Sequence, residues 1–206
     1  MLYYQGIDVP ALELLKKLFG IEIFSNLRLA GGTALALQIG HRKSIDIDLF
    51  GKLTADDFSI TNQLIKIGTV TTLSKSTNIK VLLVNGIKVD LVNYPYPWLE
   101  KQEIYDSLRL AGKKDIAAMK LAAITGRGTK KDFTDLYFLL QEISLKEMLG
   151  LYLKKYYDGS EFLVLKSLSY FADADTDEKL LMLKQVSWEK IKNFIKIKVE
   201  EYVNAL

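Results

Sequence analysis

The sequence predicts an α+β fold, with a sheet and flanking helices in residues 1–95 and an all-helical half in residues 96–206. In the first half, apolar and β-branched runs alternate with amphipathic stretches. The dipeptide Asn85-Gly86 between two β-branched runs is a strong signal for a type I′ hairpin. After residue 97, apolar residues recur at helical spacing. We therefore expect two domains, an α/β core at 1–95 and a helical subdomain at 96–206 that completes the cleft of the core.

Local signals place the individual elements. In the first half, helices are expected at 9–19, 33–39 and 54–66, with Gly40 ending the second helix and Thr54 capping the third. Strands are expected at 27–30, 44–50, 69–73, 80–84 and 87–92. In the second half, helices are expected at 114–125, 131–142, 144–156, 160–171 and 187–204, the third of them with a capping box from Ser144 to Glu147.

Composition excludes several kinds of site. The 206 residues contain no Cys, which excludes disulfides and thiolate metal sites, and the single histidine, His41, excludes a multi-histidine zinc site. The N-terminus lacks the regions of a signal peptide, and no apolar stretch approaches the roughly 20 residues that span a bilayer. We therefore expect a cytoplasmic protein without membrane contact. The net charge of +3 is compatible with a polyphosphate or nucleic acid ligand but does not require one.

Two aspartates one residue apart, Asp46 and Asp48, are the most informative feature of the chain. They alternate with the apolar residues Ile45, Ile47 and Leu49, so in a strand both carboxylates point to one face. Two carboxylates on one face of a buried strand repel each other unless a cation or a proton lies between them. Hard divalent ions such as Mg²⁺ or Mn²⁺ take carboxylate oxygens and bridge to phosphates. The pair therefore predicts a metal site for phosphate chemistry.

Two further features complete the candidate site. The pair Gly31-Gly32, followed by Thr33, begins a helix, and its backbone N–H groups can hold phosphate oxygens because no side chain blocks their approach. Asp90 is a single carboxylate inside the second hairpin strand, where it is the expected partner of Asp46 and Asp48. Three such aspartates predict a two-metal site for in-line phosphoryl transfer, in which Asp90 and Asp46 hold the second ion and orient or deprotonate an attacking hydroxyl.

These motifs resemble those of a known family. The Gly-Gly pair, the Asp-Ile-Asp motif and the later strand aspartate look like the DNA polymerase β-type nucleotidyltransferase superfamily. More narrowly, segments 31–37 and 41–50 resemble the AbiEii/AbiGii toxin family, together with a later block that contains Asp115, Lys120, Arg127, Lys131, Asp132 and Asp135. The resemblance covers most of residues 27–140. It implies a polymerase β-type core with a mixed sheet, and a role in bacterial toxin–antitoxin or phage-defence systems.

The resemblance also implies roles outside the metal site. Lys120 is expected to support catalysis, and Arg127 and Lys131 are expected to bind the nucleotide. Asp132 and Asp135 lie three residues apart on one helix and are expected to orient these cations as part of the nucleotide-binding set. Ser44 is expected to bind a phosphate or to fix the aspartate strand.

Structural interpretations of the same residues stay open. They are a tight turn at Gly31-Gly32, an exposed edge strand at 44–50, ion pairs of Asp90 with Lys88 or Lys80 and of Lys131 with Asp135, and a solvated helix position for Lys120. His41 suits a structural role better than a catalytic one. The acidic run 173–177 lacks the glycine and the final glutamate of a calcium loop, so it is interpreted as a loop or helix cap.

The reaction that the resemblance implies is metal-dependent transfer of an NMP moiety from an NTP to an acceptor hydroxyl. Within a family of this kind, an RNA 3′ end, such as that of tRNA, is the favoured acceptor, and a protein hydroxyl is the second. The expected partners are the NTP, this acceptor and a cognate antitoxin. Two alternatives remain open: a small-molecule, antibiotic-type nucleotidyltransferase, and a non-catalytic NTP-binding module.

Overall fold

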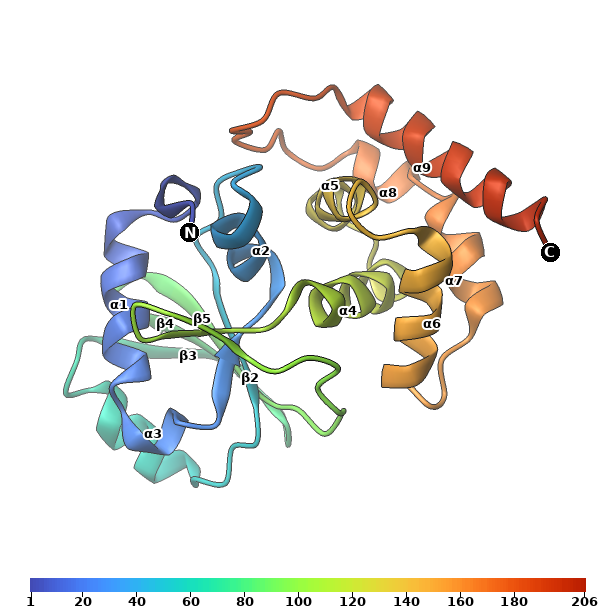
Figure 1. The fold of residues 1–206 in the computed structure, drawn as a ribbon. Helices are drawn as coiled ribbons and strands as arrows, with labels where there is room; N and C mark the ends of the chain where they lie inside the picture. The colour runs from blue at the N-terminus through green and yellow to red at the C-terminus, as the bar shows by residue number, and fades with distance from the viewer. The chain divides into compact units, whose positions relative to one another are not determined.

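The computed structural model describes all 206 residues, which divide into two compact units. The first unit consists of Met1–Pro95 and Lys101–Ala111, and the second of Tyr96–Glu100 and Gly112–Leu206. The short segment 96–100 thus belongs with the helices of the second unit, whereas the hairpin that follows it returns to the first (Figure 1).

The first unit is built on one seven-stranded sheet with the order β3-β4-β5-β2-β1-β7-β6. Strand β2 runs antiparallel to β1 and parallel to β5, and β1 is also parallel to β7, so the sheet is mixed, as expected. The strands are β1 (Leu27–Leu29), β2 (Ile47–Gly51), β3 (Val70–Lys75), β4 (Ile79–Val84), β5 (Ile87–Asn93), β6 (Glu103–Tyr105) and β7 (Leu108–Leu110).

Three helices accompany this sheet: α1 (Val9–Phe19), α2 (Gly31–Ile39) and α3 (Asp57–Leu64). Helix α1 contacts β7 and α2 contacts β2 (Figure 1). Two short 3₁₀ turns, η1 (Tyr4–Gly6) and η2 (Glu22–Phe24), flank α1. The core of the unit is formed by fully buried side chains of the central strands, which are Leu27, Leu29, Ile47, Leu49, Val89 and Leu91.

The hairpin β6–β7 contradicts the expected domain boundary at residues 95 and 96, because it places residues 101–111 in the first unit. Each of its strands has three residues, and its turn uses Asp106 and Ser107, both with positive φ (47° and 69°), in place of glycine. Strand β7 is held in the sheet by parallel pairing of Leu110 with Leu29, a contact between distant parts of the sequence. Local sequence patterns do not report such pairing, so the expected start of the helical half was too early.

Most of the predicted turns and helix caps are confirmed. Asn85 and Gly86 both have positive φ (52° and 78°), as a type I′ turn requires. Gly40 ends α2 in the left-handed region, as expected. The cap of α3 was wrongly assigned to Thr54, because the helix begins only after Asp56, whose carboxylate accepts a hydrogen bond from the Ser59 amide.

The second unit is helical. It consists of α4 (Lys113–Gly126), α5 (Lys130–Leu139), α6 (Leu145–Lys155), α7 (Glu161–Leu168), the short α8 (Ala172–Asp175) and α9 (Trp188–Val203). Helix α4 packs against α5, α6 and α7, and α9 packs against the same three helices. Ser144 caps α6 by accepting from the Glu147 amide, as expected. None of these helices, nor those of the first unit, is both long and apolar enough to cross a membrane.

A buried ion pair ties the segment 96–100 to the helices of the second unit. Lys155 on α6 lies 2.6 Å from Asp115 on α4, and both side chains are fully buried. Lys155 also donates to the Pro97 carbonyl, and the Asp115 carboxylate accepts from the amides of Leu99 and Glu100. A buried pair is stabilising only when further hydrogen bonds satisfy its remaining polar atoms, and these backbone groups do so.

Candidate active site

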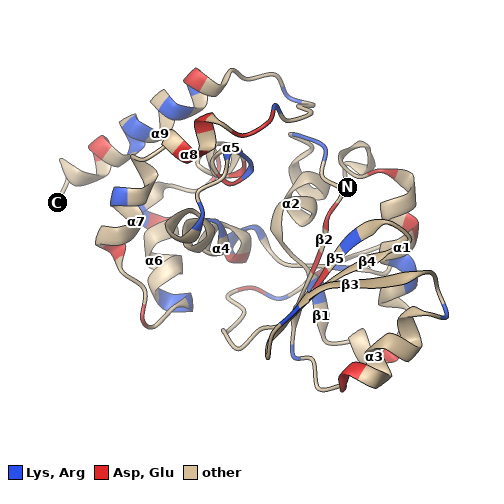
Figure 2. Ribbon diagram, turned by 180° about the vertical axis from the view of Figure 1, so that it is seen from behind, with Lys and Arg blue, Asp and Glu red and all other residues tan.

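Two of the three predicted metal-binding aspartates lie on neighbouring strands of the first unit, and the third lies just before one of these strands. Asp48 on β2 is paired in parallel register with Asp90 on β5, so their side chains project from the same face of the sheet. Asp46 lies two residues before Asp48, just ahead of the first residue of β2. Figure 2 shows acidic residues on both of these strands. We refer to Asp46, Asp48 and Asp90 as the aspartate cluster.

The apolar residues around the cluster lie on the other face of the strand. Ile47 and Leu49 are fully buried, while Asp48 and Phe50 alternate with them on the less buried face. Ile45 was expected to be buried in the strand, but it precedes β2 and is 55% exposed. The residues Asp46, Asp48 and Asp90 are each partly exposed. Strand β2 lies in the middle of the sheet, so the exposed edge strand that the sequence left open is not observed.

Gly31 lies directly against the Asp48 carboxylate. It has a positive φ of 65°, and a Cβ atom at this position would collide with Asp48 Oδ2. Glycine is therefore required both by the backbone conformation and by the close approach of the aspartate. Because α2 begins at Gly31, the amides of the first turn, which have no partner within a helix, start beside the aspartate cluster.

Thr33 connects the glycine turn to the strand that carries the aspartates. Its buried hydroxyl donates to the backbone carbonyl of Asp46 and lies 2.9 Å from the Ser44 hydroxyl. The Ser44 amide donates to the Gly6 carbonyl. Of the two roles expected for Ser44, these contacts correspond to fixing the aspartate strand.

Lys88 introduces a cation into the aspartate cluster. It lies two residues before Asp90 on β5, on the same face, and its ammonium is 2.8 Å from Asp90 Oδ2. Burial lowers the pKa of Lys88, but the hydrogen bond to Asp90 and the charges of Asp90, Asp48 and Asp46 outweigh it, so the pKa is raised. The ion pair between Asp90 and Lys88, which the sequence left open, is thus present, whereas Lys80 pairs with Asp57.

The cluster has the donor chemistry of a site for a hard divalent ion. Asp90 Oδ1 is buried and has no hydrogen-bond partner, and such an atom calls for a cation or a proton. The carboxylates of Asp48 and Asp90 lie side by side and suit Mg²⁺ or Mn²⁺. As the side chains stand, however, no three Asp, Glu or His residues of the chain form a group that could hold a metal ion. The structure is therefore more consistent with a divalent ion held by two carboxylates, Asp48 and Asp90, than with an ion held by all three aspartates.

The remaining predicted residues gather in the second unit around a buried lysine. The Lys120 ammonium on α4 lies 2.9 Å from Asp132 and 2.6 Å from Asp135, both on α5. Arg127 lies 3.1 Å from Asp132. We call these four residues the lysine cluster; it contains two positive and two negative charges.

Asp132 is the centre of the lysine cluster. Its carboxylate accepts from Lys120 and Arg127, and also from the amide and hydroxyl of Thr129, with which it forms the capping box of α5. Burial raises the pKa of Asp132, but the charges of Lys120 and Arg127 and the hydrogen bonds from Arg127 and Thr129 outweigh it and lower the pKa to about 2. Asp132 is therefore ionised at neutral pH.

The three predicted cationic site residues of the second unit differ in how far they are exposed to solvent. The Lys120 side chain is only 7% exposed and is held by two carboxylates, so it is not the solvated helix residue that the sequence left open. The Arg127 side chain is 69% exposed although its Nε is paired with Asp132, and Lys131 is also exposed. Asp135 pairs with Lys120 at 2.6 Å. Accessible positive charge thus lies on Arg127 and Lys131.

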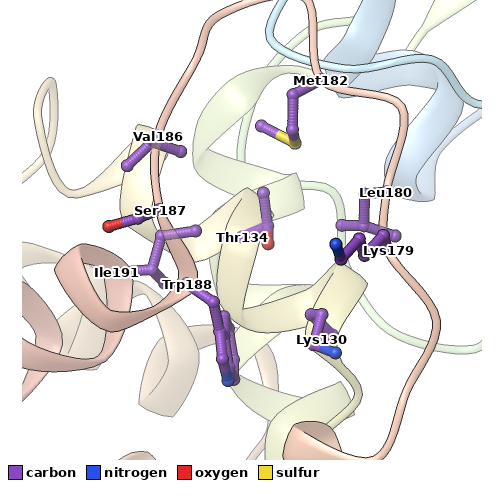
Figure 3. Close-up of a pocket in the computed structure, with 9 residues that line it drawn as sticks. All are labelled: Lys130, Thr134, Lys179, Leu180, Met182, Val186, Ser187, Trp188 and Ile191. Carbon is purple, nitrogen blue, oxygen red and sulfur yellow. The ribbon is translucent and has the colours of Figure 1, made fainter.

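A cavity of about 500 Å³ lies elsewhere in the second unit. It is lined from α5, from the segment 179–187 and from the start of α9, by Lys130, Thr134, Lys179, Leu180, Met182, Val186, Ser187, Trp188 and Ile191 (Figure 3). No residue of the aspartate or lysine cluster lines it. The acidic run beside it is structural: Asp175 accepts from Trp188 and Lys192, and Asp177 accepts from the Lys130 amide.

Sequence reasoning missed two contributors to these clusters. Lys88 was considered only as an alternative partner of Asp90, although the spacing Lys-x-Asp in a strand places both charges on one face. Thr129 was not singled out, although a Thr three residues before Asp132, at the start of an apolar helix, is a capping signal. His41 is fully buried, in agreement with a structural role.

Comparison with known proteins establishes the family. The family model "Nucleotidyl transferase AbiEii toxin, Type IV TA system" matches residues 14–203. The chain belongs to this AbiEii family of nucleotidyltransferase toxins. Like the sequence motifs, this match spans both units, so the AbiEii assignment covers the aspartate cluster and the lysine cluster alike.

Individual relatives extend the comparison. This AbiEii chain is 41% identical over 197 residues to the uncharacterised protein aq_aa25 of Aquifex aeolicus, a match that covers 93% of this chain and 95% of that protein. Its fold is similar to that of JHP933 from Helicobacter pylori, with a TM-score of 0.59, 16% identity, and coverage of 97% and 94% of the two chains. It is also similar to MenT4, a nucleotidyltransferase toxin from Mycobacterium tuberculosis, with a TM-score of 0.53, 14% identity, and coverage of 92% and 81%.

Proposed function

We propose that this AbiEii family member transfers an NMP moiety from an NTP to an acceptor hydroxyl, and that it acts as the toxin of a two-component system. The observation that carries the proposal is the register of Asp48 with Asp90 beside Gly31, with one buried Asp90 oxygen lacking a hydrogen-bond partner. This arrangement joins a carboxylate pair to the amides at the start of a nine-residue helix, which together suit a triphosphate and its counter-ion.

The proposed step is an in-line displacement at the α-phosphorus. The acceptor oxygen forms the new O–P bond, the bond between the α-phosphorus and the bridging oxygen breaks, and pyrophosphate leaves. The proton of the acceptor hydroxyl goes to a carboxylate of the aspartate cluster, for which Asp90 is the candidate. The amides of Gly31, Gly32 and Thr33 hold phosphate oxygens.

Asp48 and Asp90, together with Asp46 just ahead of β2, are the residues that would hold a divalent ion. When bound, Mg²⁺ or Mn²⁺ supplies positive charge against the phosphate oxygens and the attacking hydroxyl. Thr33 and Ser44 contribute by fixing the backbone of Asp46, since the Thr33 hydroxyl donates to its carbonyl. Rate acceleration then comes from positioning and charge neutralisation.

Charged residues of the second unit are assigned to nucleotide binding and to its support. Arg127 and Lys131 are exposed cations at and beside the lysine cluster, and we assign them to nucleotide binding, as the family resemblance implies. Lys120, Asp132 and Asp135 support catalysis by fixing Arg127 and the start of α5, since the Lys120 ammonium is engaged by both carboxylates. The favoured acceptor is an RNA 3′ end such as that of tRNA, and the expected protein partner is a cognate antitoxin.

A transfer assay tests the proposal. The protein is incubated with each labelled NTP, with Mg²⁺ or Mn²⁺, and with total tRNA, a protein extract or an aminoglycoside. Label in RNA supports the proposal, label in the aminoglycoside supports the small-molecule alternative, and NTP binding without transfer supports the non-catalytic module.

A substitution tests the assignment of the site. Asp48→Asn should lower turnover by several orders of magnitude while the protein stays folded, because the carboxylate pair loses one of its charges. Asp8→Asn, which alters an exposed aspartate of the same unit paired with Lys43, is the matched control. Near-normal transfer by Asp48→Asn would refute the assignment.

A further inference from the structure

The cavity between α5, the segment 179–187 and the start of α9 has no part in the proposed function (Figure 3). Its volume of about 500 Å³ lies within the range of roughly 300–1,000 Å³ that is usual for small-molecule sites, and it far exceeds the roughly 30 Å³ that one water molecule occupies. The cavity wall is mostly apolar and is formed by Leu180, Met182, Val186, Trp188 and Ile191. Size and lining together are those of a small-molecule site.

A buried hydroxyl without a hydrogen-bond partner lines this cavity. Thr134 on α5 is only 1% exposed, and its side chain forms no hydrogen bond with any residue of the chain. A threonine inside a helix often donates to the carbonyl four residues earlier, here that of Lys130, but this bond is not formed. Because buried polar groups are almost always hydrogen-bonded, the Thr134 hydroxyl calls for a polar partner inside the cavity.

The charged side chains that line the cavity are both lysines, and Figure 3 shows them on one side of it, with Met182 and Val186 on the other. The Lys130 ammonium donates to the Asp177 carbonyl and lies 5.6 Å from the centre of the Trp188 ring. Lys179 is exposed and has no hydrogen bond, ion pair or ring contact. No Asp or Glu lines the cavity. Lys179 therefore supplies a positive charge that an anionic group of a ligand could match.

We infer that this cavity binds a small molecule that has an apolar body of the size of one or two rings and one anionic group, such as a carboxylate or sulfonate. The apolar body packs against Trp188 and the aliphatic wall, the anionic group pairs with Lys179, and the Thr134 hydroxyl donates to a polar atom of the ligand. The site does not depend on the proposed function, because no residue of the aspartate or lysine cluster lines it.

Titration of the folded protein with 8-anilinonaphthalene-1-sulfonate, an aromatic molecule with one sulfonate, tests the inference by fluorescence and calorimetry. Wild type should bind one equivalent. Lys179→Met should weaken this binding roughly threefold to fivefold, as expected for loss of an exposed ion pair. Lys184→Met, which removes a lysine of the same segment that does not line the cavity, should bind as wild type does. The uncharged analogue N-phenyl-1-naphthylamine should bind equally to wild type and to Lys179→Met.

Two substitutions inside the cavity test its shape and its buried hydroxyl. Figure 3 shows the Met182 side chain extending from the segment 179–187 toward α5, so the larger ring of Met182→Trp should fill the cavity and abolish binding of the sulfonate. Thr134→Val keeps the shape of the side chain and removes the hydroxyl. In the protein without ligand it should not lower Tm, because no hydrogen bond is lost.

Several results would overturn the inference. They are no saturable binding of the sulfonate by wild type, equal affinities of Lys179→Met and Lys184→Met, wild-type binding by a Met182→Trp variant with an unchanged urea midpoint, and a Tm lowered by several degrees in Thr134→Val. Competitive displacement of the sulfonate by an NTP with Mg²⁺ would assign the cavity to the nucleotide and likewise overturn a separate site. Failure of the transfer assay would refute the proposed function alone, since none of these binding measurements requires turnover.

Discussion

Asp132 should make the stability of the second unit depend on pH in the acid range. Its pKa is lowered from 3.8 to about 2 in the folded protein, so the folded state favours the carboxylate by about 1.8 pKa units, or about 2 kcal/mol. A lowered pKa gives stability that is fully present above the unfolded value of 3.8 and is lost as the pH falls through about 2. Asp132→Asn removes the titrating group and with it this contribution, while the capping position stays polar.

The difference in unfolding free energy between wild type and Asp132→Asn is the quantity to measure, by urea denaturation at several pH values. It should be largest at pH 5 and above, decrease by about 1 kcal/mol by pH 3, and lose about 2 kcal/mol by pH 2. Asp173→Asn, which alters an exposed aspartate of the same unit, controls for the loss of a carboxylate as such. A difference that stays constant from pH 5 to pH 2 would refute the ionised, doubly paired state of Asp132.

Three further substitutions test other parts of the molecule. Gly31→Ala should cost about 1–2 kcal/mol of unfolding free energy because φ is +65°, and should lower turnover by displacing Asp48; a fully active, equally stable variant would contradict the close approach. Lys155→Met should cost about 3–5 kcal/mol by leaving Asp115 buried and unpaired, so an unchanged urea midpoint would disprove the buried pair. Arg127→Ala should cost only about 1 kcal/mol of stability, because Lys120 and Thr129 still hold the buried Asp132 carboxylate, but it should raise the KM for NTP; an unaltered KM would remove it from the proposed nucleotide set.

Local chemistry made much of the first unit predictable. The Asn85-Gly86 turn, the strands on either side of it and the end of α2 at Gly40 follow from conformations that few residues adopt. The projection of Asp46 and Asp48 to one face follows from the two-residue repeat of a strand. The register of Asp48 with Asp90 does not, because it depends on parallel pairing of β2 with β5, which lie far apart in the sequence.

Long-range pairing also explains what was missed. Strands β6 and β7 have three residues each, too few to show a repeat, and β7 is held by its pairing with β1. The lysine cluster was foreseen as a set of residues, but not as a set in which Lys120 is buried between two carboxylates. A sequence shows which charges are present and on which helix face they lie, whereas burial depends on how α4 and α5 pack.

The two clusters differ in how their charged side chains are paired. In the aspartate cluster an ion pair joins Lys88 to Asp90, whereas in the lysine cluster Lys120 and Arg127 are paired with Asp132 and Asp135. A buried lysine held by two carboxylates has little charge left for a phosphate, since its nearest neighbours already neutralise it. In the proposed function, nucleotide binding by the second unit is therefore assigned to the exposed part of Arg127 and to Lys131, and Lys120 is expected to keep the start of α5 in place.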